Sequence, residues 1–163
     1  MTKDLIFASW GEGFQRIIKE FPITILEKAH NDRQPYMITV GKDPLHPFCF
    51  LNIASDTFVI GFLAEYNRKY LQYLFVEKVP QKLFLCSATY YEFEGDKKDF
   101  WFRTDYNFNS DGTLIIVKSD LRTRQKERLT AQNKIDVSAN WEDYPAFGCY
   151  DGLIKIERGL VMS

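Results

Sequence analysis

Two acid-rich stretches hold the side chains of this sequence that could do chemistry. The stretch from Glu92 to Asp111 has six acidic and three basic residues, and the stretch from Asp136 to Asp151 has four acidic residues and no basic one. Tyrosine and tryptophan residues are interleaved with both. Carboxylates beside large aromatic side chains are typical of a surface that docks a basic protein, because rim acids steer the encounter and the rings fill pockets.

We therefore predict that eight residues contact such a partner: Glu92, Glu94, Asp105, Trp141, Glu142, Asp143, Tyr144 and Asp151. The acids would pair with lysines or arginines of the partner, and the side chains of Trp141 and Tyr144 would fill pockets on its surface. A competing interpretation is that the charges only solubilise strand faces while the rings fill the core. A pair of hydrolytic carboxylates is a third interpretation, but the spacing singles out no two of them.

Other catalytic patterns are missing from the sequence. The two histidines, His30 and His46, are not part of a metal-binding spacing, so we expect no metal and no cofactor. No Gly-x-Ser-x-Gly elbow for a nucleophile occurs. The fragment Gly11-Glu12-Gly13 lacks the rest of a nucleotide-binding loop. These observations predict that the protein is not an enzyme.

The composition is that of one globular domain over residues 1–163. The chain has a mass of 19.2 kDa, with 45% apolar and 16% aromatic residues, which is enough to build a core. Its net charge of −1 argues against a general nucleic-acid binder. Without a membrane-length apolar run or a secretory leader, we expect a cytoplasmic protein with no membrane partner, whose three separated cysteines stay reduced.

The elements that must position these residues are mostly strands. Residues 10–20 have apolar residues at three- and four-residue spacing after a capping Ser9, which predicts an N-terminal helix that Pro22 ends. Short runs at 36–40, 48–53, 57–63 and 70–76 are rich in aromatic and β-branched residues and predict strands, although the last run also suits a helix face.

The clearest pattern runs from Leu83 to Ser119. Three strands at 84–93, 100–108 and 113–118 are separated by two turns, of which Asp111-Gly112 is the stronger turn signal. The polar residues 120–134 suit either an edge strand or a short exposed helix, and an irregular tail follows. The expected fold is α+β, with the N-terminal helix packed on a mostly antiparallel, meander-like sheet of five to seven strands.

The second half of the chain resembles a group of bacterial proteins. The residues that carry the likeness are Tyr106–Gly112, Lys118–Leu121, Asp136–Pro145, Phe147-Gly148 and Tyr150-Asp151. This half is similar in style to the small cytosolic immunity proteins that accompany polymorphic and contact-dependent growth inhibition toxins. The resemblance implies a non-enzymatic inhibitor that binds the C-terminal toxin domain of a cognate effector, often a nuclease. It carries over no binding residue.

The first hypothesis is therefore an immunity protein that neutralises a cognate toxin domain by tight stoichiometric binding, as a monomer or weak homo-oligomer. An exposed sheet edge could also accept a strand from the toxin. The alternative is a small-molecule binding domain, in which the aromatic-rich sheet curls around an apolar ligand.

Overall fold

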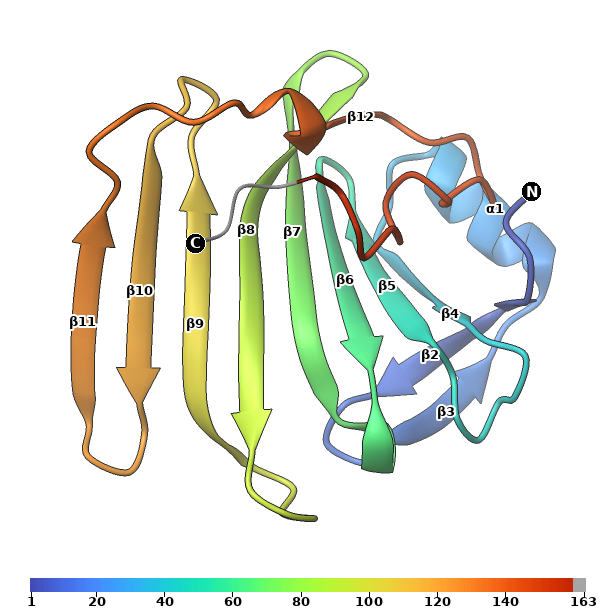
Figure 1. Ribbon diagram of the computed structural model, residues 1–163. Coiled ribbons are helices and arrows are strands. Elements are labelled where there is room, and N and C mark those ends of the chain that lie inside the picture. Colours follow the sequence, from blue (N-terminus) through green and yellow to red (C-terminus); the bar gives the residue numbers. More distant parts are fainter. Residues whose placement is uncertain (160–163) are drawn as a thin grey trace.

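A computed structural model describes residues 1–159 of the chain, and its dominant feature is one large antiparallel sheet (Figure 1). Strands that follow one another in sequence lie side by side from β4 to β11. The short β1 extends the sheet beyond β4, and β12 pairs with the start of β8. The strands are β1 (Leu5–Ile6), β2 (Ala8–Gly11), β3 (Arg16–Glu20), β4 (Tyr36–Val40), β5 (Cys49–Ala54), β6 (Thr57–Leu63), β7 (Lys69–Val79), β8 (Lys82–Phe93), β9 (Phe100–Phe108), β10 (Leu114–Asp120), β11 (Gln125–Thr130) and β12 (Trp141–Asp143). The helical elements are α1 (Ile23–Asn31) and the 3₁₀ turns η1 (Glu65–Asn67) and η2 (Ser138–Asn140).

The predicted N-terminal helix over residues 10–20 is wrong. These residues form the β2–β3 hairpin, in which Trp10 lies opposite Ile17 and Gln15 adopts a φ of 53° in the turn. The spacing that suggested a helix is not one buried face, because Phe14 and Ile18 are exposed. Pro22 precedes the helix that does form instead of ending one, as its fixed φ favours at a helix start.

The predicted fold class is wrong as well. The described residues contain a single short α-helix, α1, and the structure is mostly antiparallel β rather than a helix packed on a sheet of five to seven strands. The strands themselves were predicted better: β4 and β6 match their predicted bounds, and β8, β9 and β10 form the expected meander. Of the two alternatives for residues 120–134, the edge strand is correct and is β11.

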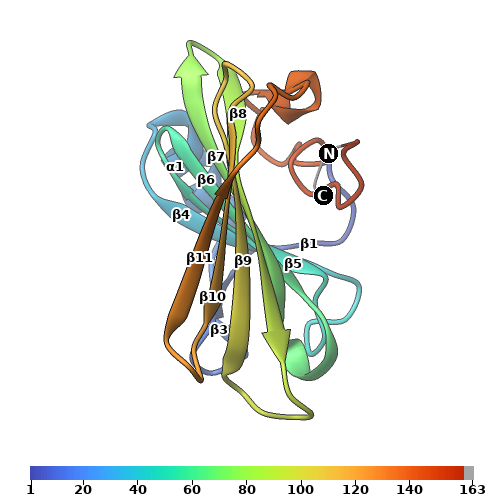
Figure 2. The same cartoon turned by 60° about the vertical axis from the view of Figure 1, so that its left-hand side comes forward.

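One face of the sheet carries the main core, and we call it the covered face. Directly opposed residues share a face, so five residues in one row, from β5 to β9, point to one side of the sheet: Leu51, Ile60, Tyr73, Ala88 and Tyr106. The C-terminal segment, residues 131–159, packs on that side, as Figure 2 shows with the sheet nearly edge-on. The Tyr73 hydroxyl donates to the carbonyl of Ile156 at 2.8 Å.

The opposite face, the open face, is covered only in part. The β2–β3 hairpin packs there on β4 and β5, where Trp10, Phe50 and Leu63 form a small second core. Phe50 begins a row of opposed residues that continues through Gly61, Gln72, Thr89, Asp105 and Val117 to Arg128. From β7 onward Thr89 and Asp105 are buried, whereas Gln72, Val117 and Arg128 reach the solvent.

A buried chain of hydrogen bonds joins α1 to the C-terminal segment. The Tyr36 hydroxyl lies 2.8 Å from Nδ1 of His30 and 2.7 Å from the Tyr150 hydroxyl, and Nε2 of His30 lies 3.0 Å from the carbonyl of Pro145. Because that carbonyl can only accept, Nε2 carries a proton. Burial, together with the nearby positive charge of Arg33, lowers the pKa of His30 although the Pro145 bond opposes this, and this shift favours the neutral ring, whose Nδ1 accepts from Tyr36.

This arrangement predicts that acid destabilises the fold. In the unfolded chain His30 takes up a proton near its ordinary pKa of about 6.5, whereas in the folded chain it does so only at lower pH. The neutral His30 therefore contributes its full stabilisation above the unfolded-state pKa of about 6.5. This contribution to the free energy of unfolding is lost as the pH falls from there toward the lower folded-state pKa. Urea denaturation at pH 7.5 and pH 5 measures this slope. We expect a smaller slope in H30Q and the wild-type slope in H46Q, which alters an exposed loop histidine; equal slopes in wild type and H30Q would contradict the assignment.

Candidate functional site

The three acids predicted around β12 differ in how far contacts within the fold engage them. Glu142 accepts from the Arg158 guanidinium at 2.7 Å and pairs with Lys155 at 3.2 Å, and the Arg158 side chain is only 1% exposed. Asp143 is exposed and pairs with Lys82. Asp151 is exposed too. Glu142 thus anchors the tail of the chain, and of these three acids it is the least available to a partner.

The two predicted anchor rings also pack internally. Trp141 lies against Phe84, with ring centroids 4.8 Å apart. The Tyr144 hydroxyl donates to the carbonyl of Ser55 at 2.7 Å, and its ring stacks on the Arg33 guanidinium at 3.9 Å. Burial raises the pKa of Tyr144. Both rings are half-buried, so each offers a partner only one side.

The remaining predicted residues lie elsewhere on the sheet. Glu92 is exposed on β8, and Glu94 in the β8–β9 loop lies near Lys97 and Arg122. Asp105 is buried on the open face, where it accepts from Thr89 at 2.7 Å and from Nε of Arg103 at 2.9 Å.

The structure does not bring the eight residues together. Glu142 pairs with Leu83 at one end of β8, and Glu92 lies nine residues along the same strand. At the rise of an extended strand these two acids are about 30 Å apart. The two acidic stretches therefore form separate surfaces. Asp105 is part of the first stretch in sequence, but its buried side chain lies on neither surface.

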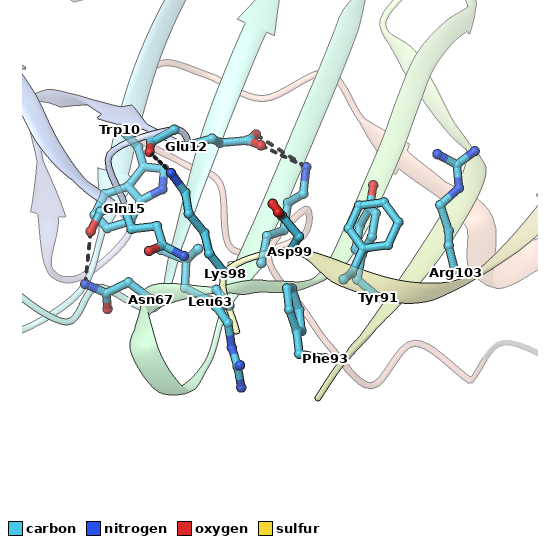
Figure 3. A pocket seen from close by; sticks show the side chains of 14 residues that line it. Trp10, Glu12, Gln15, Leu63, Asn67, Tyr91, Phe93, Lys98, Asp99 and Arg103 are labelled. Atoms are coloured by element: carbon cyan, nitrogen blue, oxygen red, sulfur yellow. Dashed lines mark hydrogen bonds and ion pairs between the residues drawn. The ribbon is translucent and has the colours of Figure 1, made fainter. Parts of the chain in front are cut away.

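A groove on the open face gathers aromatic side chains that the sequence did not single out as a group. It encloses about 350 Å³ between the β2–β3 hairpin, the β6–β7 connection and the β8–β9 hairpin (Figure 3). Its aromatic lining consists of Trp10, Tyr91, Phe93 and Phe100. The rings of Tyr91 and Phe100 meet edge to face, with centroids 4.8 Å apart. We call this site the Tyr91 groove.

Long-range hydrogen bonds hold the walls of the Tyr91 groove in place. Lys98 in the β8–β9 loop donates to the carbonyl of Gly13 in the β2–β3 turn at 2.6 Å, joining residues 85 positions apart. The Arg68 guanidinium donates to the carbonyls of Gly95 and Lys97 at 2.7 and 3.0 Å and lies over the Phe93 ring. Because both hairpin tips are tied to distant elements, the groove is a built feature of the fold.

The Tyr91 groove carries a positive excess. Four basic residues line it, Arg68, Lys69, Lys98 and Arg103, against two acids, Glu12 and Asp99. Lys69 pairs with Glu12 at 3.2 Å and lies 5.1 Å from the centroid of the Tyr91 ring. Burial raises the pKa of Tyr91, although the neighbouring Arg103 opposes the shift, so its hydroxyl stays protonated at neutral pH.

The lining of the groove contains no serine, threonine, cysteine or histidine, and residues 1–159 contain no group of three or more metal-ligating side chains. Cys49 and Cys86 are free thiols whose pKa burial raises, which makes them poor nucleophiles. An open, aromatic-lined hollow with a few polar groups suits a small ligand with a flat apolar part.

Part of this site was within reach of the sequence. Tyr91, Phe93 and Arg103 lie on the two strands of the predicted meander, and strand alternation places them on one face. Trp10 and Glu12 were assigned to a helix that does not exist, so their side of the groove could not be found by pattern.

Comparison with known proteins adds no relative: no family model matches the sequence, no curated protein matches it and no solved structure matches its fold. Within residues 1–159, no helix has the length and apolar character needed to cross a membrane.

Proposed function

We propose that this chain is a non-catalytic binding protein and that the Tyr91 groove is its ligand site. The observation that carries the proposal is the aromatic lining of the groove. Tyr91, Phe93 and Phe100 line a hollow that no side chain of the described residues fills. Aromatic surface left uncovered beside a packed core is typical of ligand sites, because a bound ligand removes that surface from water.

The architecture supports the same proposal. The hydrogen bonds of Lys98 and Arg68 fix both walls before any ligand arrives, so binding costs little ordering of the protein. The lining contains both flat rings and charged ends, which favours a ligand with a planar apolar part over an aliphatic chain.

The groove predicts binding of N-phenyl-1-naphthylamine, a neutral aromatic dye whose fluorescence rises in apolar surroundings. We expect saturable, one-to-one binding to the folded protein. Y91A and F93A should each weaken it about tenfold, because each removes a ring contact worth roughly 1–2 kcal/mol. V79A, which trims an exposed apolar side chain outside the groove, is the matched control. A titration in which Y91A and V79A bind alike would refute the site.

Toxin neutralisation is the second candidate function, and the free edge of the sheet favours it. All six residues of β11 are exposed, and among the described strands only β10 pairs with it. An unpaired strand edge can accept an extended segment of a partner through its main-chain groups.

The test of this second candidate is recovery from the native host of a stoichiometric complex with a toxin C-terminal domain. Slowed amide hydrogen exchange in residues 125–130 of that complex would assign the contact to β11. Recovery of no such domain by the folded protein, or unchanged exchange at β11, would count against it.

A further inference from the structure

In one cation of the Tyr91 groove, Arg103, both terminal nitrogens are free, among the described residues, to donate hydrogen bonds. Arg103 donates from Nε to Asp105, and within residues 1–159 its two terminal nitrogens have no hydrogen-bond partner. The side chain is 43% exposed. A guanidinium carries five N–H donors in a fixed planar fork, so Arg103 can still donate two parallel hydrogen bonds to an acceptor with two oxygens.

The other three cations of the groove are already engaged with the protein. Arg68 donates to two backbone carbonyls, Lys98 donates to a third, and Lys69 is shared between Glu12 and the side chain of Gln72. Their charges still contribute to the potential of the groove. The Nε of Arg68 is also buried without a hydrogen-bond partner, so Arg103 is distinguished by having both terminal nitrogens free within residues 1–159.

Asp105 fixes the direction in which Arg103 points. This carboxylate is buried, and its second oxygen is held by the Thr89 hydroxyl at 2.7 Å, so it forms a rigid support for Nε. Because Asp105 engages only Nε, the donors of the two terminal nitrogens remain available. Asp105 was predicted to meet a partner directly; the geometry instead gives it the role of orienting another side chain.

Arg103 stands next to the aromatic lining. It lies directly across from Tyr91 on the neighbouring strand, and both point to the open face (Figure 3). Lys69 approaches the Tyr91 ring as well, and its Nζ is 5.1 Å from the ring centroid. A flat ring on Tyr91 would therefore have a bidentate donor at its edge.

From this arrangement we propose that the ligand of the Tyr91 groove is a planar ring that carries an anionic group with two or more equivalent oxygens, such as a carboxylate, a sulfonate or a phosphate. The ring packs on Tyr91, and the anionic group accepts from the terminal nitrogens of Arg103. This inference rests on the proposed function, because it names the ligand class of the same groove.

A pair of dyes separates the two proposals. 1-Anilinonaphthalene-8-sulfonate has the rings of N-phenyl-1-naphthylamine plus one sulfonate. We expect the sulfonate to bind the folded wild-type protein about tenfold to a hundredfold more tightly than the neutral dye, the gain of a charge-assisted hydrogen bond. R103Q should bring the ratio of the two affinities close to one. Circular dichroism and the unfolding midpoint show whether each variant is folded.

Two further variants complete the design. R122Q removes an arginine that stacks on Trp101 at 3.7 Å outside the groove, and it should keep the wild-type ratio. R103K keeps the charge but not the fork, and it should lower the ratio less than R103Q. If R103Q does not fold, the wild-type ratio and R103K decide.

Equal affinities of the two dyes for wild type, or a ratio that survives both changes at Arg103, would overturn the anionic ligand and leave the groove in place. If neither dye binds the folded protein, the proposed function fails and this inference fails with it.

Discussion

Replacing Glu142 with lysine is expected to destabilise the protein by about 3–5 kcal/mol, the usual cost of breaking a buried ion pair from one side. The Arg158 side chain is almost fully buried, and Glu142 is its only carboxylate partner in the described chain. Arg158 also donates to the carbonyls of Gly152 and Ala139 and lies over the Phe75 ring. E142K would replace the shared carboxylate by a positive charge beside both Arg158 and Lys155.

Thermal unfolding measures this effect, and a fall in the melting temperature of roughly 10 °C is expected for a chain of this size. D143K is the matched control: it reverses the adjacent acid, which is exposed and pairs with Lys82, and should stay within about 0.5 kcal/mol of wild type. Similar melting temperatures for the two variants would show that Arg158 does not depend on Glu142. Because E142K is expected to destabilise the fold, a loss of partner binding in this variant would not identify Glu142 as an interface residue.

Replacing Gly61 with valine is expected to destabilise the protein by about 1–3 kcal/mol through overpacking. Gly61 lies opposite Phe50 on the open face, and a Cβ at this position would overlap the Phe50 ring, which is itself 1% exposed. Phe50 packs with Trp10, so a displaced ring separates the β2–β3 hairpin from the sheet. Trp10 also lines the Tyr91 groove, and dye binding should weaken together with stability.

Urea denaturation combined with tryptophan fluorescence tests this second prediction. G61V should lower the denaturation midpoint and shift the emission to longer wavelength as Trp10 meets water. G13A is the control, because no atom lies within 4 Å of a Cβ at that turn position. A G61V protein with the wild-type midpoint and emission would mean that the sheet absorbs the valine without moving Phe50.

The sequence by itself determined the meander. In β9 the residues alternate between the two faces, and the same period is present in β8 and β10, so each strand could be recognised within its own run of residues. The Asp111-Gly112 turn was equally local: Gly112 adopts a φ of 92°, which glycine accepts without strain. The alternation also correctly implied that Asp105 and Arg103 share a face.

Only the tertiary structure decided the N-terminal segment and the site. Residues 10–20 carry a spacing that suits a helix, but Trp10 gains more by packing on Phe50, forty residues away, than a short helix interrupted by two glycines could provide. From the sequence, Glu142 was expected to be available to a partner, but in the structure it pairs with Arg158. The groove depends on Lys98 reaching Gly13 and on Arg68 reaching the β8–β9 loop. Periodicity indicates the local structural preference of the chain. These contacts join residues far apart in sequence, so they stabilise the protein only once the sheet has brought those residues together.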